Sequence, residues 1–197
     1  QKKVSEFAKD NNISGLEFMS CIPGSIGGGI RMNSGCFKKE FKDFLISIQV
    51  VDFKGLVRSI PANKISFNYR SIELPKDLIF LSATFKGKQK NSEEINNYMT
   101  ELNTIKNMAQ PTKIKTSGST FKNPISQTDK KVWELIKSSV SHEISYGDAV
   151  ISKKHANFFV NKKNAKAADM KSLINFVKKK VKDQTGIKLE LEIVVVE

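Results

Sequence analysis

Apolar residues in the first half of the chain are spaced mainly as in strands and loops. Residues 4–10 have the spacing of a short helix that stops at 11–12, and a second short apolar segment covers 16–22. Three stretches have the apolar pattern of strands: 44–51, 56–60 and 78–85. A turn at 54–55 separates the first two. We therefore expect this half to form a sheet connected by loops.

The apolar spacing changes to a helical period at Ser92. Five apolar residues recur at this spacing: Ile95, Tyr98, Met99, Leu102 and Ile105. Ser92 is placed to cap the helix, and Glu93 and Glu94 fall in its first turn. We expect this helix to link two domains.

The remaining sequence predicts a helix at 132–138, a longer helix and a closing strand at 187–196. The longer helix has Asp169 as its predicted cap and Gly186 as its stop. Five of its residues form one apolar face: Met170, Leu173, Ile174, Val177 and Val181. We expect this face to pack into a core and to need no ligand.

The order of these elements predicts an α+β fold, because strands come first and a smaller unit of helices and strands follows the linking helix. We expect two domains, one at 1–108 and the other at 109–197. The sequence contains no internal repeat and no low-complexity linker.

Lysine dominates the charge of the chain, and its distribution bears on the class of partner. The formal net charge is +13, but the only arginines are Arg31, Arg58 and Arg70, and the lysines are scattered through every segment. Nucleic-acid-binding proteins usually gather arginine and lysine on one surface. We therefore expect no nucleic-acid partner, and instead a basic surface that attracts an anionic substrate.

We expect neither a membrane span nor a metal site. No apolar run approaches the ~18 residues of a membrane span, and the first residues lack the apolar stretch of a secretion signal. We therefore expect a cytoplasmic protein with no membrane partner. The chain has two cysteines and two histidines, and their spacing matches no metal-binding motif: Cys21, Cys36, His142 and His155.

A glycine cluster is the first candidate for chemistry. Residues 23–29 contain four glycines, and 31–35 continue the polar segment with RMNSG. Glycine lets backbone amides approach a phosphate or a ring without an intervening side chain. The cluster fits neither GxGxxG nor GxxxxGK[ST], so it is neither a Rossmann fingerprint nor a P-loop. Tight turns in a crowded loop would explain it equally well.

Three further positions could carry chemistry but have ordinary explanations. Ser119 lies in the polar segment 118–124, which lacks the GxSxG motif of a hydrolase. Without other evidence, a serine after glycine is best explained as a turn residue or a helix cap. Without other evidence, Arg70 is best explained as an ordinary surface arginine. Alternation on the closing strand would place Glu190 and Glu192 on one face, either as an exposed pair or as a buried, protonated acid.

Taken together and in order, these segments resemble the UDP-N-acetylenolpyruvoylglucosamine reductases, the flavoenzyme family known as MurB. The blocks that carry the resemblance extend over almost the whole chain: 15–18, 22–28, 31–35, 67–70, 110–111, 118–124, 154–161 and 189–193. Arg70 and Ser119 are 49 positions apart. That compact spacing is similar to the subclass without a substrate-covering insertion.

The resemblance implies the remainder of an FAD-binding domain of the PCMH/VAO-like type at 1–108 and a smaller C-terminal substrate-binding domain at 109–197. It also implies a reaction in two stages. NADPH reduces bound FAD, and the reduced flavin then passes hydride to the double bond of UDP-N-acetylglucosamine enolpyruvate. The product is UDP-N-acetylmuramate, a peptidoglycan precursor.

The resemblance assigns roles to individual residues. Arg70 and Glu192 match the positions that stabilise charge at the substrate carboxylate, and Ser119 matches the proton donor. Three residues match positions that hold the UDP-sugar: Tyr69, Lys122 and Asn123. Nine residues match positions that contact FAD: Ile22, Pro23, Gly24, Ser25, Ile26, Gly27, Gly28, Asn33 and Gly35.

The chain also departs from the family pattern. The family's first glycine-rich flavin block has no counterpart, so the chain resembles an N-terminally truncated member, with the missing segment as a possible partner on a separate or cleaved chain. Ala109 stands where the family often has a polar or basic residue. Diphosphate binding would then fall to one of three lysines: Lys113, Lys115 or Lys122.

Two other interpretations stay open from the sequence alone. One is a relative of the same flavin-binding fold that acts on another substrate. The other is a fragment that binds nucleotide or a partner without turnover. Flavin absorbance of the purified protein separates an FAD-binding enzyme from such a fragment.

Overall fold

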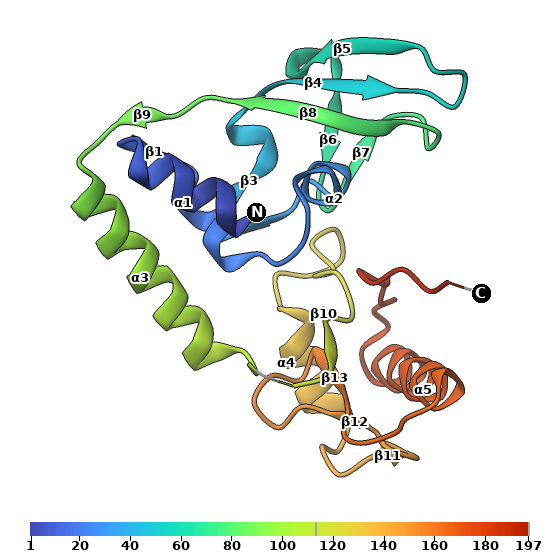
Figure 1. The fold of residues 1–197 in the computed structure, drawn as a ribbon. Helices are drawn as coiled ribbons and strands as arrows, with labels where there is room; N and C mark the ends of the chain where they lie inside the picture. Colours follow the sequence, from blue (N-terminus) through green and yellow to red (C-terminus); the bar gives the residue numbers. More distant parts are fainter. Residues whose placement is uncertain (113, 197) are drawn as a thin grey trace. The chain divides into compact units, whose positions relative to one another are not determined.

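The computed structural model describes residues 1–112 and 114–196. It divides into two compact units, Gln1–Lys106 and Asn107–Glu197 (Figure 1). The division falls close to the expected boundary and lies within the last turns of the long helix α3 (Ser92–Ala109). Both units contain helices and strands, which confirms the predicted α+β class.

Unit 1 contains a three-stranded antiparallel sheet in the order β5-β4-β8 and three two-stranded pairs, β1-β9, β2-β3 and β6-β7. Its strands are β1 (Ile13–Ser14), β2 (Gly35–Cys36), β3 (Lys39–Glu40), β4 (Leu45–Val51), β5 (Val57–Pro61), β6 (Ser66–Asn68), β7 (Ser71–Glu73), β8 (Ile79–Phe85) and β9 (Lys88–Gln89). Its helical elements, besides α3, are α1 (Lys2–Asp10), η1 (Glu17–Cys21), α2 (Ile26–Arg31), η2 (Phe41–Asp43) and η3 (Ala62–Lys64). The three strands predicted at 44–51, 56–60 and 78–85 are confirmed as β4, β5 and β8.

The core of unit 1 joins this sheet to the helical segments that precede it. Phe41 is fully buried, and its ring meets those of Phe18 and Phe85 edge to face, with centroids 6.0 and 5.7 Å apart. Ile48 and Val50 of β4 are buried on the same side as these rings. Burying several large apolar side chains of this kind is the main stabilising contribution to such a unit.

Two details of unit 1 differ from the sequence predictions. The glycine cluster, for which tight turns were one of the open interpretations, contains the helix α2, which packs on β8. The cap of α3 is Asn91 rather than Ser92, because the Asn91 side chain accepts the amide of Glu93 at 2.8 Å. The Ser92 amide instead donates to the Asn12 side chain at 2.9 Å. Asparagine is at least as good a cap as serine, so the neighbouring residue takes the position.

Unit 2 is a four-stranded antiparallel sheet in the order β10-β13-β12-β11, packed against two helices (Figure 1). The elements are β10 (Thr116–Ser119), α4 (Val132–Ser139), β11 (Ser145–Tyr146), β12 (Ala149–Ile151), β13 (Phe158–Asn161) and α5 (Ala167–Thr185). Its core centres on Phe121 and Phe159, whose rings lie 5.8 Å apart, and on buried residues of both helices.

Helix α5 presents the predicted apolar face to this core. Leu173 and Val177 are fully buried, while Met170 at the start of the face is half-buried. Gly186 ends the helix in the left-handed region with φ of 74°, as predicted. Asp169 is not the N-cap, because it lies inside the first turn and accepts the amide of Lys166 at 2.9 Å.

The predicted closing strand at 187–196 is wrong. This segment makes one isolated bridge, between Leu191 and Phe121, formed by the backbone hydrogen bonds from Lys122 to Glu190 and from Glu192 to Thr120. Val194 and Val196 are 80% and 89% exposed, so the apolar run beyond the bridge has no partner strand among the described residues. A run of β-branched residues favours a strand only where a neighbour supplies the second half of the ladder.

Candidate active site

The glycine-rich loop of unit 1 turns directly into a short helix. Gly24 has a φ of 107°, a conformation that favours glycine, and the next residue, Ser25, caps α2. The Ser25 side chain accepts the Gly28 amide at 3.1 Å. Serine at this position therefore has a local structural role in addition to its predicted contact with FAD.

The glycines within α2 allow its backbone to lie against the core. A Cβ atom on Gly27 would lie 3.3 Å from the Phe80 Cβ, and one on Gly29 would lie 2.5 Å from the Phe41 ring. Each glycine costs roughly 1 kcal/mol of helix stability relative to alanine. Close packing thus explains why glycine is tolerated at positions 27 and 29 of this helix.

A groove of about 320 Å³ follows the contact between α2 and β8. We call it the α2–β8 groove. Ile26, Gly27 and Ile30 line one side, and Phe80 and Leu81 belong to the other. Leu81 remains 50% exposed. Two predicted cofactor residues, Ile26 and Gly27, therefore border an apolar groove of the size that holds small molecules.

Asn33 and Gly35 shape the end of this loop. Asn33 is fully buried, and its side-chain NH₂ donates to Glu40 at 3.0 Å and to the Asn68 carbonyl at 3.1 Å. Its side-chain oxygen accepts the Lys42 amide at 3.1 Å. A Cβ atom on Gly35 would lie 2.3 Å from the Lys39 carbonyl oxygen. Both residues hold the loop against the β2-β3 hairpin, and their predicted contact with FAD stays a prediction.

Arg70 lies at the tip of the tight hairpin between β6 and β7. It adopts a φ of 56°, and its guanidinium stacks on the ring of Tyr69 with 4.9 Å between the guanidinium carbon and the ring centroid. One Nη donates to the Gly35 carbonyl at 2.8 Å, and the other lies 3.7 Å from a Glu40 carboxylate oxygen. The side chain of Arg70 is only 16% exposed. The hairpin therefore brings Arg70 to the end of the glycine loop.

Sequence reasoning missed Glu40, which orients Arg70. One carboxylate oxygen faces Arg70, while the other accepts from Asn33 and forms an ion pair with Lys42 at 3.0 Å. The hydrogen bond to Glu40 raises the pKa of the Lys42 ammonium above its usual value. No motif marks Glu40 in the sequence, because its partners are a turn arginine and a buried asparagine from other segments.

Ser119 ends β10 and pairs with Phe158 of β13 across an irregular register. The preceding Gly118 has a φ of 88°. Directly after Ser119, the carbonyl of Thr120 accepts the amide of Glu192 at 2.9 Å. Within unit 2, the structure therefore places Ser119 and Glu192 on neighbouring backbone segments.

The two glutamates of the C-terminal segment differ in their surroundings. Glu190 is exposed, with its carboxylate 4.0 Å from the Lys122 ammonium. Glu192 is half-buried. The expectation of two carboxylates on one face of a strand fails, since the segment is not a regular strand and the alternation rule does not apply to it.

Asn157 fixes the segment that follows Ser119, and sequence reasoning did not assign it this role. Its buried carboxamide accepts the Phe121 amide at 3.0 Å and donates to the Phe121 carbonyl at 2.9 Å. Its backbone carbonyl accepts the Thr120 amide at 2.8 Å. Its own amide donates to Nδ1 of His155 at 3.3 Å, and burial lowers the pKa of that imidazole. Asn157 was visible only as part of the block 154–161.

The predicted substrate-binding residues of unit 2 also have structural contacts. Lys122 donates its amide to the Glu190 carbonyl at 2.9 Å. The Asn123 side chain accepts the Val132 amide at 3.0 Å at the start of α4. Of the other lysines considered for diphosphate binding, Lys115 bonds the Lys163 carbonyl at 3.4 Å, and Lys113 lies outside the described residues.

The described residues contain no cluster of metal ligands and no candidate membrane span. No group of three or more histidine, cysteine or acidic side chains there could hold a metal ion, and both cysteines are free. Among the helices of residues 1–112 and 114–196, none has the length and apolar character needed to cross a bilayer.

Comparison with known proteins identifies the family that this chain resembles. A family model described as the C-terminal domain of UDP-N-acetylenolpyruvoylglucosamine reductase matches residues 110–196. A reductase of that name from Pelagibacter ubique (strain HTCC1062) is 64% identical over 192 residues, which cover 98% of this chain and 64% of the relative. One from Rickettsia bellii (strain RML369-C) is 45% identical over 190 residues, which cover 96% of this chain and 62% of the relative.

A solved structure agrees with these relatives. The crystal structure of UDP-N-acetylenolpyruvylglucosamine reductase (MurB) from Thermus caldophilus matches with a TM-score of 0.83 at 32% identity. The match covers 96% of this chain and 66% of that one. The chain thus spans a little under two thirds of the length of these relatives.

Proposed function

Because the chain belongs to the UDP-N-acetylenolpyruvoylglucosamine reductase (MurB) family, we propose that the protein reduces UDP-N-acetylglucosamine enolpyruvate to UDP-N-acetylmuramate with NADPH and FAD. The proposal applies to the complete protein, since the chain covers 64% of the relative from Pelagibacter ubique. A nucleotide-linked sugar and NADPH are cytoplasmic metabolites, which supports a cytoplasmic location.

The observation that supports this proposal is the backbone pairing that holds Thr120, the residue directly after Ser119, beside Glu192. A hydroxyl can donate a proton to a developing carbanion, and a carboxyl group nearby can polarise or stabilise the reacting acid. The Glu192 amide bonds the Thr120 carbonyl, and the Lys122 amide bonds the Glu190 carbonyl. These two hydrogen bonds set the register between the two segments without using either reactive side chain.

The α2–β8 groove fits the proposed cofactor. Its walls are mainly apolar, its volume is about 320 Å³, and Gly27 brings the backbone of α2 close to Phe80 at its edge. A flat ring system can lie on such a surface, so we propose that Ile26 and Gly27 contact FAD together with the predicted loop residues 22–25, Gly28, Asn33 and Gly35. When bound, FAD would supply the hydride for the reduction.

We propose that Arg70 binds the substrate carboxylate. A planar guanidinium matches a carboxylate better than an ammonium does, because it offers parallel N–H donors. Hydride addition to the terminal carbon leaves negative charge that spreads into this carboxylate. The hydrogen bond from Arg70 to Gly35 and its contact with Glu40 orient the guanidinium before substrate arrives.

We propose that Ser119 protonates the intermediate and that Glu192 stabilises the charge near it. The Ser119 hydroxyl must regain its proton from solvent or a neighbour after each turnover. Tyr69, Lys122 and Asn123 would hold the UDP-sugar, with Lys122 and Lys115 as candidates for the diphosphate. Lysine is suited to phosphate as a mobile point charge.

Replacement of Ser119 tests this assignment in the full-length protein with FAD. Ser119→Ala should leave the reduction of FAD by NADPH almost unchanged, because that half-reaction forms no substrate carbanion. Reoxidation of the flavin by substrate should slow by at least about 100-fold, and Ser119→Cys should recover part of the rate. Stopped-flow absorbance measures the two half-reactions separately. Ser117→Ala, an exposed neighbour on β10, is the matched control. Equal slowing of both half-reactions in Ser119→Ala would remove Ser119 from the proton-transfer step.

A further inference from the structure

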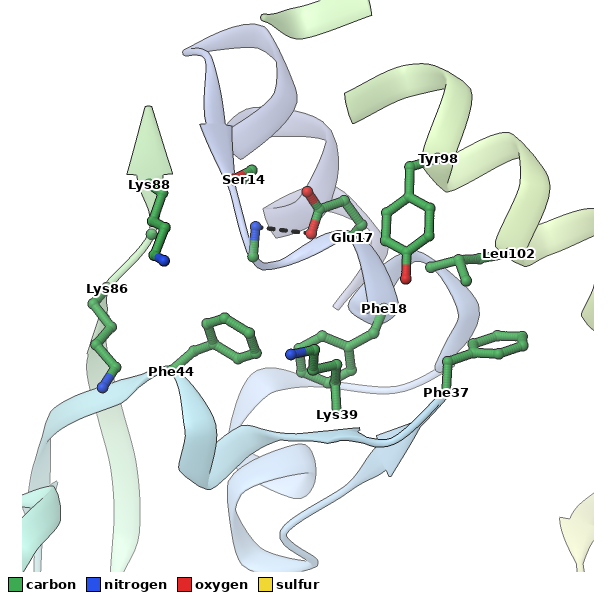
Figure 2. A pocket seen from close by; sticks show the side chains of 12 residues that line it. Ser14, Glu17, Phe18, Phe37, Lys39, Phe44, Lys86, Lys88, Tyr98 and Leu102 are labelled. Atoms are coloured by element: carbon green, nitrogen blue, oxygen red, sulfur yellow. Dashed lines mark hydrogen bonds between the residues drawn. The ribbon is translucent and has the colours of Figure 1, made fainter. Parts of the chain in front are cut away.

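A second cavity lies in unit 1 and belongs to none of the predicted sites. It has a volume of about 300 Å³, and it shares no lining residue with the α2–β8 groove. We call it the Tyr98 cavity after one of its lining residues. η1, the β2-β3 hairpin, the β8-β9 connection and α3 each contribute to its walls. Figure 2 shows the side chains around it.

Two glycines bring the walls of this cavity close together. Gly15 has a φ of 112°, and a Cβ atom there would lie 2.7 Å from the Phe44 ring. A Cβ atom on Gly87 would lie 2.2 Å from the Ile13 side chain and 2.8 Å from the Ser14 carbonyl oxygen. The β1-β9 pairing also joins these two walls, with Ser14 opposite Lys88. The cavity is therefore built into the backbone fold and does not depend on one flexible side chain.

Aromatic rings supply most of the apolar lining. Phe18 and Phe44 stack at 5.6 Å between centroids, and Phe37 and Tyr98 line the cavity from the hairpin and from α3 (Figure 2). Tyr98 is 42% exposed although it lies on the apolar face predicted for α3. Rings in this arrangement offer faces and edges to another planar ring.

The charge around the cavity is predominantly positive. Lys39, Lys86 and Lys88 line it together with a single acid, Glu17. The Glu17 carboxylate accepts the Gly15 amide at 2.8 Å, and Glu17 as a residue is only 8% exposed. In the part of the chain that the structure describes, no carboxylate forms an ion pair with any of the three lysines. The Lys39 ammonium lies 5.8 Å from the centroid of the Phe44 ring.

We propose that the Tyr98 cavity is a binding site for a planar aromatic anion. The ring of the ligand packs against Phe44 and Tyr98, and its carboxylate or phosphate meets the ammonium groups of Lys39 and Lys86. Aromatic walls with a few charged groups at the rim are typical of small-molecule sites. The proposal does not rest on the proposed reductase function, since none of the lining residues is among those proposed above to contact FAD, bind the substrate or take part in catalysis.

Titration of the chain with small probes, followed by amide NMR shifts, tests the proposal. The probes are 2-naphthoate, adenosine 5′-monophosphate and the uncharged 2-naphthalenemethanol. At least one anionic probe should bind at least tenfold more tightly than the alcohol, with shifts at Gly15, Gly87 and Lys88. Preference for the nucleotide would assign a nucleoside phosphate, and preference for naphthoate an aromatic carboxylate. Equal affinity for the alcohol and both anions would overturn the proposal.

Variants of the lysines locate the site. Lys39→Met should weaken binding of the preferred anion about tenfold, whereas Lys38→Met should not. Lys38 is the matched control because it is the adjacent, exposed turn residue and does not line the cavity. Lys86→Met gives a second, independent measure. Unchanged affinity in both cavity variants, or competition between the probe and FAD, would place the probe outside this cavity and overturn the proposal.

Discussion

Arg70 combines an unusual backbone conformation with a side chain that contacts Tyr69, Gly35 and Glu40. A non-glycine residue at a φ of 56° is strained, and such strain often occurs at functional sites. The tight β6-β7 hairpin imposes the conformation, and Glu40 and the Gly35 carbonyl then determine where the guanidinium points. Glu40 thereby connects Arg70, which we propose to bind the substrate carboxylate, with Asn33 at the end of the glycine loop.

Replacement of Arg70 by lysine should leave the fold intact and remove most of the activity. The charge is kept, but a single ammonium cannot reproduce the planar fork on a carboxylate. We expect flavin reoxidation by substrate to slow about 100-fold in the full-length protein, the scale typical of losing one preorganised donor. Arg58→Lys, at an exposed position on β5, serves as the control. Reoxidation at the normal rate in Arg70→Lys would exclude a catalytic role.

The buried carboxamide of Asn157 should contribute substantially to the free energy of unfolding. In Asn157→Asp, a carboxylate would face the Phe121 carbonyl in a buried position and could no longer donate to it. Burying such a charge without a partner should cost about 3 kcal/mol of unfolding free energy. Urea denaturation measures the loss, with the exposed Asn175→Asp on α5 as control. Equal stability of the two variants would show that the Asn157 clamp is unimportant.

At the scale of elements, periodic segments were predictable and pairings were not. Helix α5 and the strands β4 and β8 each carry an apolar period long enough to identify them. The segment 187–196 has strong strand propensity but forms only the bridge at Leu191, since pairing depends on a partner elsewhere in the chain. Glu40 and Asn157 were missed for the same reason. Asn157 bonds Phe121, 36 positions away, and no local pattern encodes such a contact.

The apolar face of α5 permits a direct test of its packing. Val177 is fully buried in the core of unit 2, so Val177→Asp places a charge where no partner is available in the described core. A loss of about 4 kcal/mol or more should unfold this unit. Ser172→Asp, exposed on the same helix, should change stability little. Circular dichroism melting compares the two. Normal melting of Val177→Asp would mean that α5 does not pack as described.

At the scale of the whole molecule, each unit has its own hydrophobic core. The two clusters of buried residues share no member, and the α2–β8 groove lies wholly in unit 1. Ligand binding stabilises only the cooperative unit that forms the site. Calorimetry with added FAD should therefore raise the melting temperature of one transition, and that transition should persist in Val177→Asp. A shift confined to the transition lost in that variant would place the cofactor site in unit 2.

The glycine content of α2 has a consequence for the order of folding. Three successive glycines, Gly27 to Gly29, give this segment almost no tendency to form a helix before its neighbours are in place. The helix depends on contact with Phe41 and with Phe80, and Phe80 belongs to β8, which forms only when it pairs with the distant β4. We infer that α2 is absent from the folding transition state and condenses afterwards. Substitutions there should change the unfolding rate and leave the folding rate nearly constant.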